Sequence, residues 1–200
     1  MSYVDEIRVC VISALTDVPD STSIGRGGVQ PWRSDNVSVK RLLILRHAKS
    51  DWGDSSLDDW QRPLSARGIN DAPRVGEMLR ERSSIPDLII TSDAIRARST
   101  AEAVAEAAGY TGEIFLEPAL YHATPDAIVE VLNSLEDDSA AAVMIVGHNP
   151  GLEGLIAELS GDYQAMPTAA LVQLALPIDR WQDLDLSLSA SVVDTWRPGD

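Results

Sequence analysis

The chain has very little cysteine and no long apolar run, and both absences narrow its possible functions. Cys10 is the only cysteine among 200 residues, which excludes an intramolecular disulfide and any paired-cysteine metal or redox motif. The longest apolar stretches, such as 140–146, are far shorter than the roughly 20 apolar residues that a membrane-spanning helix needs. We therefore expect a protein of a reducing compartment, the cytoplasm, without a membrane partner.

Positive charge is almost missing from the second half of the chain. Residues 1–100 contain 14 basic and 14 acidic side chains, whereas residues 101–200 contain 2 basic side chains, Arg180 and Arg197, and 17 acidic ones. The net charge of −15 repels nucleic-acid backbones, so we expect no nucleic acid as a partner. A site for an anionic ligand must take its cations from the first half.

The N-terminal part of the chain lacks a helical or strand period. Residues 16–39 are rich in Ser, Gly, Asp and Pro, and the apolar run at 9–15 follows acidic residues without a clear cleavage site. We expect residues 1–38 to be a poorly ordered extension without a role of its own, Cys10 included. The remaining 39–200 are expected to form one domain.

The rest of the chain alternates between strands and helices. Apolar runs predict strands at 42–45, 88–91, 113–116, 141–146, 168–176 and 184–196. Between them, apolar residues recur at helical spacing, with Ser65, Ser92 and Thr124 placed to begin helices. Pro73 should kink the first of these helices or mark its late start. The pattern predicts an α/β fold with three α/β/α layers and a mostly parallel central sheet.

Polar residues follow three of the predicted strands at the point where each strand ends. Arg46 and His47 follow the first, Ser92 to Arg96 follow the second, and His148 follows the fourth. The carboxyl ends of parallel strands meet at one edge of a sheet, where ligands bind. Because the planar guanidinium group of arginine binds two oxygens at once, these residues predict a site for a phosphate group.

A histidine in such a cluster is suited to nucleophilic catalysis. Neighbouring positive charge disfavours the imidazolium form and leaves a neutral ring nitrogen that can attack phosphorus. Arg98 lies about 200° around the helix from Arg96, so we expect Arg98 on the surface. No two of the three histidines have the spacing that places ligands on one helix face, so we expect no zinc site.

Several other residues have two open interpretations. Lys49, Arg62 and Arg67 either widen the phosphate site or are solvated surface charges. The loop at 51–60, rich in Asp and Trp, either walls the crevice or packs locally. His122 is expected to be a solvated loop residue.

Three motifs carry a resemblance to a known family. LLILRHAKSDW at 42–52 resembles the Arg-His signature of the histidine phosphatase superfamily, which has the phosphoglycerate mutase-like fold. SDAIRARSTA at 92–101 and GHNPG at 147–151 resemble its second phosphate-binding motif and its second histidine motif. With RPLS at 62–65 and MPT at 166–168, the chain is most similar to the small SixA-type phosphohistidine phosphatases.

The resemblance implies a metal-independent phosphohydrolase that forms a phosphohistidine on the enzyme and uses no cofactor. It implies His47 as the nucleophile, Arg46 and Arg96 as phosphate clamps, and His148 as a further donor to the phosphoryl oxygens. The other residues expected to contact the substrate are Ser92, Lys49 and Arg62.

The proton donor and the substrate stay open at this point. Many family members carry a glutamate after the third strand, and the candidates here are Glu117, Tyr121, His122 and Asp126, or no residue at all. A histidine nitrogen leaves without a strong acid, and the short segment 110–126 should leave the crevice open to a protein. We therefore expect phosphohistidine on a protein as substrate, the alternatives being a small phosphomonoester or a catalytically inactive phosphoryl-binding module.

Overall fold

A computed structural model describes residues 39–136 and 138–199 of the chain. The predicted extension at 1–38, with Cys10, lies outside the described residues. The strands are β1 (Lys40–Arg46), β2 (Leu88–Thr91), β3 (Ile114–Leu116), β4 (Ala142–Gly147), β5 (Leu171–Leu176) and β6 (Ser191–Trp196). The helices are α2 (Ala66–Glu81), α3 (Ile95–Ala108), α4 (Pro125–Asn133) and α5 (Gly151–Ser160), with short 3-10 helices η1 (Asp59–Gln61), η2 (Pro118–Leu120) and η3 (Trp181–Asp183).

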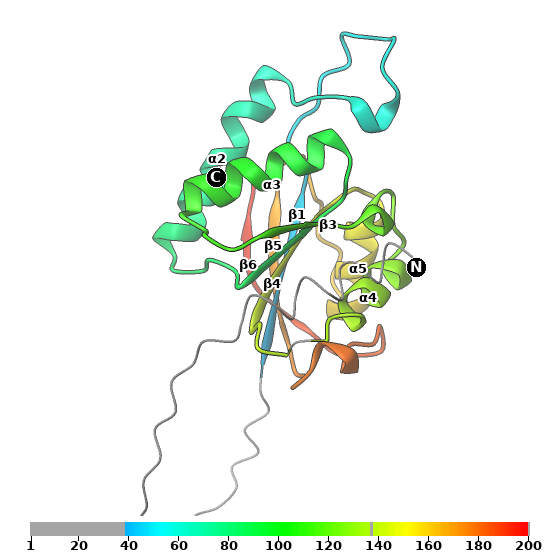
Figure 1. Cartoon of the computed structure of the whole chain (residues 1–200). Coiled ribbons are helices and arrows are strands. Elements are labelled where there is room, and N and C mark those ends of the chain that lie inside the picture. Colours follow the sequence, from blue (N-terminus) through cyan, green and yellow to red (C-terminus); the bar gives the residue numbers. More distant parts are fainter. Residues whose placement is uncertain (1–38, 137, 200) are drawn as a thin grey trace, which may run out of the picture.

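One mixed sheet with helices on both faces forms the fold, as predicted (Figure 1). The strand order is β3-β2-β4-β1-β5-β6, and β5 runs antiparallel to both of its neighbours. Side chains of β1 alternate between two apolar clusters: Leu43 and Leu45 pack with α2 and α3, whereas Leu42 and Ile44 pack with α4 and α5. The uninterrupted apolar run of β1 is therefore explained by burial on both faces.

Helix starts follow the predicted caps at two places. The Ser65 hydroxyl accepts a hydrogen bond from the Gly68 amide at the start of α2. The Thr124 hydroxyl accepts one from the Ala127 amide at the start of α4. α2 runs without interruption through Pro73, so a late start of this helix is wrong. Burial of the α2 face that contains Ala72 and Val75 compensates for the backbone hydrogen bond that proline cannot donate.

Three other boundaries differ from the prediction by three residues or more, and one of them is the start of β5, at Leu171 and not at residue 168. α3 begins at Ile95 and not at Ser92, because the Ser92 hydroxyl is held between the Ala94 amide and His148. The predicted strand at 184–196 contains only β6, and a turn closed by the Leu188 amide and the Asp185 carbonyl precedes it. Leu184, Leu186 and Leu188 alternate with polar residues as in a strand. They do so because they pack against the core around α4 and α5, although they do not pair in the sheet. No helix within the described residues is long and apolar enough to cross a membrane.

Candidate active site

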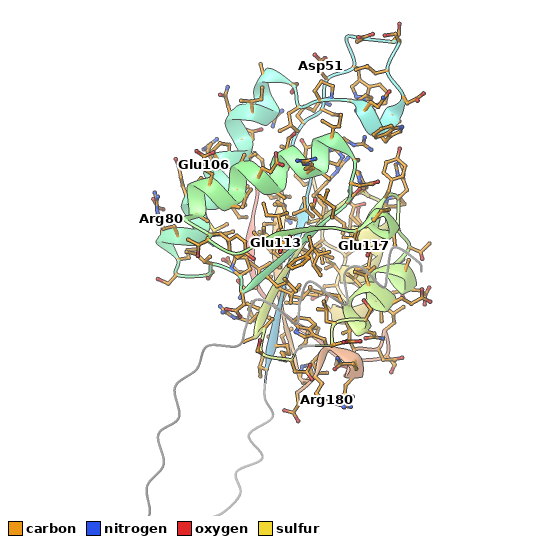
Figure 2. All side chains as sticks on the ribbon, viewed as in Figure 1. Asp51, Arg80, Glu106, Glu113, Glu117 and Arg180 are labelled. Atoms are coloured by element: carbon orange, nitrogen blue, oxygen red, sulfur yellow. The ribbon has the colours of Figure 1, made fainter. Side chains whose placement is uncertain are left out.

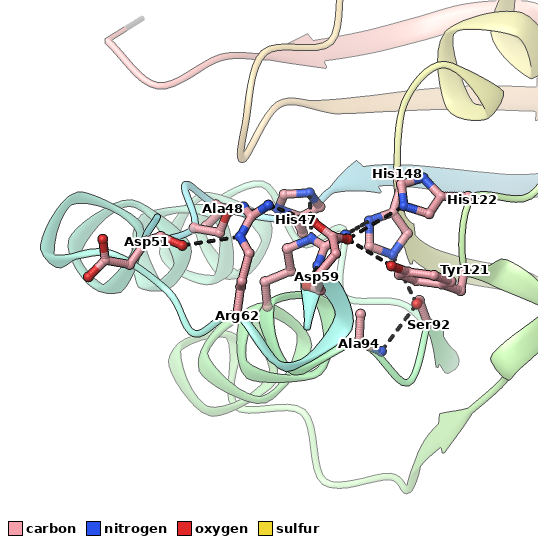
Figure 3. A network of polar contacts seen from close by, with 12 residues as sticks. His47, Ala48, Asp51, Asp59, Arg62, Ser92, Ala94, Tyr121, His122 and His148 are labelled. Carbon is pink, nitrogen blue, oxygen red and sulfur yellow. Dashed lines mark hydrogen bonds and ion pairs between the residues drawn. The ribbon is translucent and has the colours of Figure 1, made fainter. Parts of the chain in front are cut away.

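The register of the sheet brings three strand ends together. Arg46 at the end of β1 pairs with Gly147 at the end of β4, so His47 and His148 follow at the same level. The His47 amide donates to the Gly147 carbonyl at 3.1 Å. On the other side of β4, the Ser92 amide donates to the Val146 carbonyl at 3.0 Å. The residues after β1, β2 and β4 therefore meet around one point, as Figure 3 shows.

A cavity of about 300 Å³ opens at this edge of the sheet. Its lining residues are Arg46, His47, Lys49, Ser50, Trp52, Asp59, Arg62, Arg96, His122, His148, Asn149 and Thr168. All four of its cationic side chains come from the first half of the chain, as the charge distribution required. Arg180, from the second half, lies at the far end of the molecule and pairs with Asp183 (Figure 2).

His47 presents an unprotonated nitrogen to the cavity. Its side chain is buried, and Nδ1 lies 2.7 Å from the Ala48 carbonyl oxygen. Because a carbonyl only accepts, Nδ1 carries the proton and Nε2 keeps a lone pair, to which Arg96 Nε donates at 3.3 Å. Burial, together with the charges of Arg96 and Arg46, outweighs the Ala48 hydrogen bond and lowers the pKa of His47 to about 4. The ring is therefore neutral at pH 7, as a nucleophile requires.

His148 is also neutral, and its proton points away from the cavity. Its Nδ1 accepts from Arg96 Nη2 at 3.3 Å, and its Nε2 lies 2.9 Å from the Ser92 hydroxyl. Burial, followed by the proximity of His47 and Arg96, lowers the pKa of His148 to about 2. His148 can donate to a phosphoryl oxygen only after Nδ1 gains a proton, which a bound dianion favours. Ser92 is buried and does not line the cavity, so it positions His148 and is not placed to bind substrate.

The two arginines predicted as phosphate clamps reach the cavity from different elements. Arg96, on α3, is 3% exposed. Arg46, at the end of β1, donates from Nη1 to the Met166 carbonyl at 2.7 Å, and its buried Nε has no hydrogen-bond partner in the part of the chain that the structure describes. Burial lowers the pKa of Arg46, and the charge of Glu153 opposes this effect. Arg98 lies on the outer side of α3 and pairs with Glu102, away from the site.

The carboxylate of Asp59 lies among the donors of the site. Its Oδ2 accepts from Arg96 Nη2 at 2.8 Å and from the Tyr121 hydroxyl at 2.7 Å, and it lies 3.6 Å from His122 Nε2. Its Oδ1 accepts from Arg62 Nη1 at 2.6 Å. Partial burial acts to raise the pKa of Asp59, but the Tyr121 hydrogen bond and the two arginines outweigh it and lower the pKa to about 2. An internal anion therefore occupies donors that a phosphoryl group would use.

Arg62 holds the loop that carries Asp59. Its Nε donates to the Asp51 carbonyl at 3.1 Å, Nη1 donates to Asp59, and Nη2 donates to the Ser50 hydroxyl. The guanidinium group also lies 3.3 Å from the ring centre of Trp52. These three hydrogen bonds use three of the five N–H groups of Arg62, which also lines the cavity, so the side chain both positions Asp59 and keeps donors that a substrate could use.

The other two basic residues with open interpretations separate in the structure. Lys49 is exposed and lines the cavity, where its ammonium group adds positive charge. Arg67 lies on α2, pairs with Asp71 at 3.0 Å and does not line the cavity. Lys49 therefore extends the cationic surface of the site, and Arg67 is a surface charge.

Only one of the four proton-donor candidates lines the cavity. Glu117 accepts from the Ala119 amide at the start of η2, and Asp126 lies in the first turn of α4. Burial and the hydrogen bond to Asp59 raise the pKa of Tyr121. His122 lines the cavity, with its ring centre 5.2 Å from that of His148, and it is at the same time a solvent-exposed turn residue, as expected. Its φ of 51° turns the chain so that the ring packs against the site.

The described residues contain no group of three or more His, Cys, Asp or Glu side chains that could hold a metal ion. Around His47, four lining side chains are instead cationic, against one carboxylate, that of Asp59. Such a donor set suits an anion such as phosphate.

Comparisons with known proteins agree with this geometry. Residues 42–123 match the family model of the histidine phosphatase superfamily (branch 1). The chain is 34% identical over 151 residues to an uncharacterized chloroplastic protein of Arabidopsis thaliana, covering 70% of this chain and 69% of that protein. Its fold is similar to that of the putative phosphohistidine phosphatase SixA from Agrobacterium tumefaciens (TM-score 0.67, 25% identity, 80% of this chain and 98% of that chain).

A mycobacterial glucosyl-3-phosphoglycerate phosphatase has a similar fold as well (TM-score 0.55, 19% identity, 78% of this chain and 97% of that chain). At this identity the likeness concerns the fold alone. The family model covers β1, β2 and α3, which carry Arg46, His47 and Arg96. The chain therefore belongs to branch 1 of the histidine phosphatase superfamily.

Proposed function

We propose that this protein is a phosphatase that transfers the phosphoryl group of its substrate to Nε2 of His47 and then to water. One observation carries the proposal: the Ala48 carbonyl fixes the proton of His47 on Nδ1, so the lone pair of Nε2 faces a cavity lined by arginines. Nε2 attacks phosphorus in line with the leaving group, and the P–N bond forms as the bond to the leaving group breaks. Water then attacks the phosphohistidine, and the electron pair of the P–N bond returns to Nε2.

The arginines supply the stabilisation of charge. Phosphoryl transfer needs little covalent chemistry from a protein beyond positioning and the neutralisation of charge on the three equatorial oxygens. Arg46 has an unused buried Nε, and Arg96 contacts both His47 and His148. The two guanidinium groups are placed to hold the phosphoryl group beside Nε2, and no metal ion is needed for this step.

Phosphohistidine on a protein is the substrate that we propose. The rim of the cavity is open, because Lys49 and Trp52 are exposed there. An open rim admits a phosphorylated side chain presented on a folded surface. The structural neighbour from Agrobacterium tumefaciens, described as a putative phosphohistidine phosphatase, supports the same substrate.

A small phosphomonoester is the second candidate. The observation that favours it is His122 at the cavity, beside Asp59, because an alcohol needs a proton at the departing oxygen, whereas a histidine can take its proton from solvent on the other ring nitrogen. Net charge bears on both candidates: at −15, the protein repels highly anionic substrates such as polyphosphate.

Trapping the intermediate tests the proposed mechanism. After brief incubation with a labelled phosphate donor and a rapid quench, the wild type should carry an acid-labile, base-stable phosphoryl group. His47→Ala, with its fold checked by circular dichroism, should carry none. Labelling that persists in this variant would overturn the assignment of His47. Phosphate analogues that bind without turnover of any substrate would indicate an inactive binding module.

A comparison of catalytic efficiencies tests the substrate. A phosphohistidine protein and a panel of sugar, nucleotide and glycerate phosphates are measured at one moderate salt concentration. We expect the highest kcat/KM for the phosphohistidine protein. If one small ester is turned over orders of magnitude better, the protein substrate is wrong while the His47 mechanism stands.

A further inference from the structure

Depth within the cavity fixes the side on which the leaving group departs. His47, Arg96 and His148 are at most 8% exposed, whereas the side chain of His122 is 53% exposed. In an in-line transfer, the leaving group lies on the opposite side of phosphorus from the nucleophile. Because the body of a substrate cannot enter the buried floor, it must extend toward the exposed rim, which His122 shares with Lys49 and Trp52.

We propose that His122 is the proton donor to the leaving group, which extends the substrates of this site to phosphomonoesters of alcohols. The inference rests on the proposed transfer to His47. Glu117 and Asp126 do not line the cavity, and the Tyr121 hydroxyl is committed to Asp59. Of the four candidates, His122 is the one that lines the cavity, and it does so at the exposed rim toward which the substrate extends.

Contacts on three sides hold the His122 ring in place. Its Nε2 lies 3.6 Å from Asp59 Oδ2, an ion-pair distance for a protonated imidazole. Its ring centre lies 4.4 Å from that of Tyr121 and 5.2 Å from that of His148. Among the described residues, Nδ1 makes no hydrogen bond. Asp59 therefore faces one N–H of the imidazolium, and the other is left for a ligand.

The backbone of His122 supports a functional role. A non-glycine residue with φ of 51° lies in the left-handed region, which costs free energy and occurs often at active sites. The neighbouring Ala123 carbonyl is covered by Gly151 at the start of α5, where a Cβ atom would overlap with it. Close packing thus keeps this conformation in place, and the conformation turns the ring toward His148.

The proton transfers balance over the two steps. As the P–O bond breaks, Nδ1–H of the His122 imidazolium gives its proton to the leaving oxygen, so that an alcohol departs and the ring becomes neutral. In the second step, the neutral Nδ1 takes a proton from the water that attacks the phosphohistidine. His122 is then an imidazolium again, and phosphate is released.

A series of leaving groups tests the proposal. The variant is His122→Asn, because asparagine tolerates the left-handed backbone but cannot transfer the proton. For alkyl phosphates, kcat/KM, which reports the transfer to His47 and not the later hydrolysis, should fall by about 10²- to 10⁴-fold, the usual contribution of general acid catalysis. For p-nitrophenyl phosphate and a phosphohistidine protein, whose leaving groups depend least on an acid, kcat/KM should stay within a few-fold of the wild type. Glu117→Gln and Asp126→Asn are matched controls and should leave the whole series unchanged.

Chemical rescue provides a second readout that a structural role would not give. Glycine suits the backbone of residue 122, and free imidazole added to His122→Gly should restore kcat/KM for alkyl phosphates without changing kcat/KM for p-nitrophenyl phosphate. An equal loss of kcat/KM across all leaving groups, or no loss for alkyl phosphates, would overturn the proposal. Trapping of phosphorylated His47 in the same variants separates this failure from a failure of the proposed function, because the intermediate should still form from p-nitrophenyl phosphate.

Discussion

One residue of this site, Asp59, competes with a phosphoryl group for the hydrogen-bond donors of the site. Asp59 accepts hydrogen bonds from Arg96, Arg62 and Tyr121, so its carboxylate takes donors that would otherwise be open to a phosphoryl oxygen. A phosphoryl dianion that enters the cavity meets this negative charge. Asp59 therefore holds the two arginines in place in the free protein and weakens the binding of the anion.

Replacement of Asp59 by asparagine should strengthen phosphate binding. Asp59→Asn keeps the shape of the side chain and removes its charge, and because the side chain is partly exposed we expect about a fivefold lower Kd, roughly 1 kcal/mol. Isothermal titration with inorganic phosphate at pH 7 measures this. Asp54→Asn removes the same charge from the same loop without touching the cavity, and it should change Kd little. Weaker binding of phosphate by Asp59→Asn would contradict the claim that Asp59 competes with phosphate for the arginines.

Among the secondary-structure elements, α5 connects the second histidine motif to the segment with His122. Gly151 is both the last residue of the motif at 147–151, which contains His148, and the first residue of α5. A Cβ atom at Gly151 would overlap with the Ala123 carbonyl, so the helix and this segment approach as closely as backbones can. This contact is one reason why His122 and His148 lie side by side.

A methyl group at this contact should therefore disturb both stability and catalysis. We expect Gly151→Ala to lower the free energy of unfolding by about 1–3 kcal/mol through overpacking, and to reduce the hydrolysis of alkyl phosphates by moving His122. Urea denaturation and steady-state kinetics measure the two effects. Gly154→Ala, one turn further along α5, meets only the Pro125 side chain at 3.0 Å and should be milder in both. Equal effects of the two substitutions would refute the role of the Gly151 contact.

For the whole molecule, two buried neutral histidines connect the site to stability. The folded-state pKa values of His47 and His148 are lowered to about 4 and about 2, below the value of about 6.5 for an unfolded chain. Below pH 6.5, the unfolded chain binds protons that the folded protein does not. The free energy of unfolding should therefore fall as the pH is lowered from 6.5 toward 4, and this contribution is fully present only above pH 6.5.

The size of this effect can be measured by denaturation at two pH values. A pKa shift from 6.5 to about 4 corresponds to about 3 kcal/mol for His47, at 1.36 kcal/mol per unit. Between pH 7 and pH 4.5, we expect the wild type to lose roughly 2–3 kcal/mol more in urea than His47→Asn does. Carboxylates titrate in both proteins and cancel in the difference. Equal losses would show that His47 is not held neutral by the fold.

The local pattern of apolar and polar residues along the chain was sufficient to predict much of the fold and part of the site. Apolar runs located all six strands, with 168–176 and 184–196 too long, because a strand buried on both faces must be apolar throughout. The chain order also placed Arg46, His47, Arg96 and His148 at strand or helix ends on one edge of the sheet. The excess of basic residues in the first half required that cations of the site come from there.

The sequence alone therefore determined the strand ends that carry the chemistry and the sign of charge around them, because these depend on residues near one another in the chain. Only the tertiary structure decided that Asp59 reaches Arg96, 37 positions away, and that His122 packs against His148. It also decided that the Ser92 hydroxyl hydrogen-bonds to His148 and is not placed to bind the substrate. Such contacts depend on how loops return over the edge of the sheet, which hydrophobic periodicity does not encode.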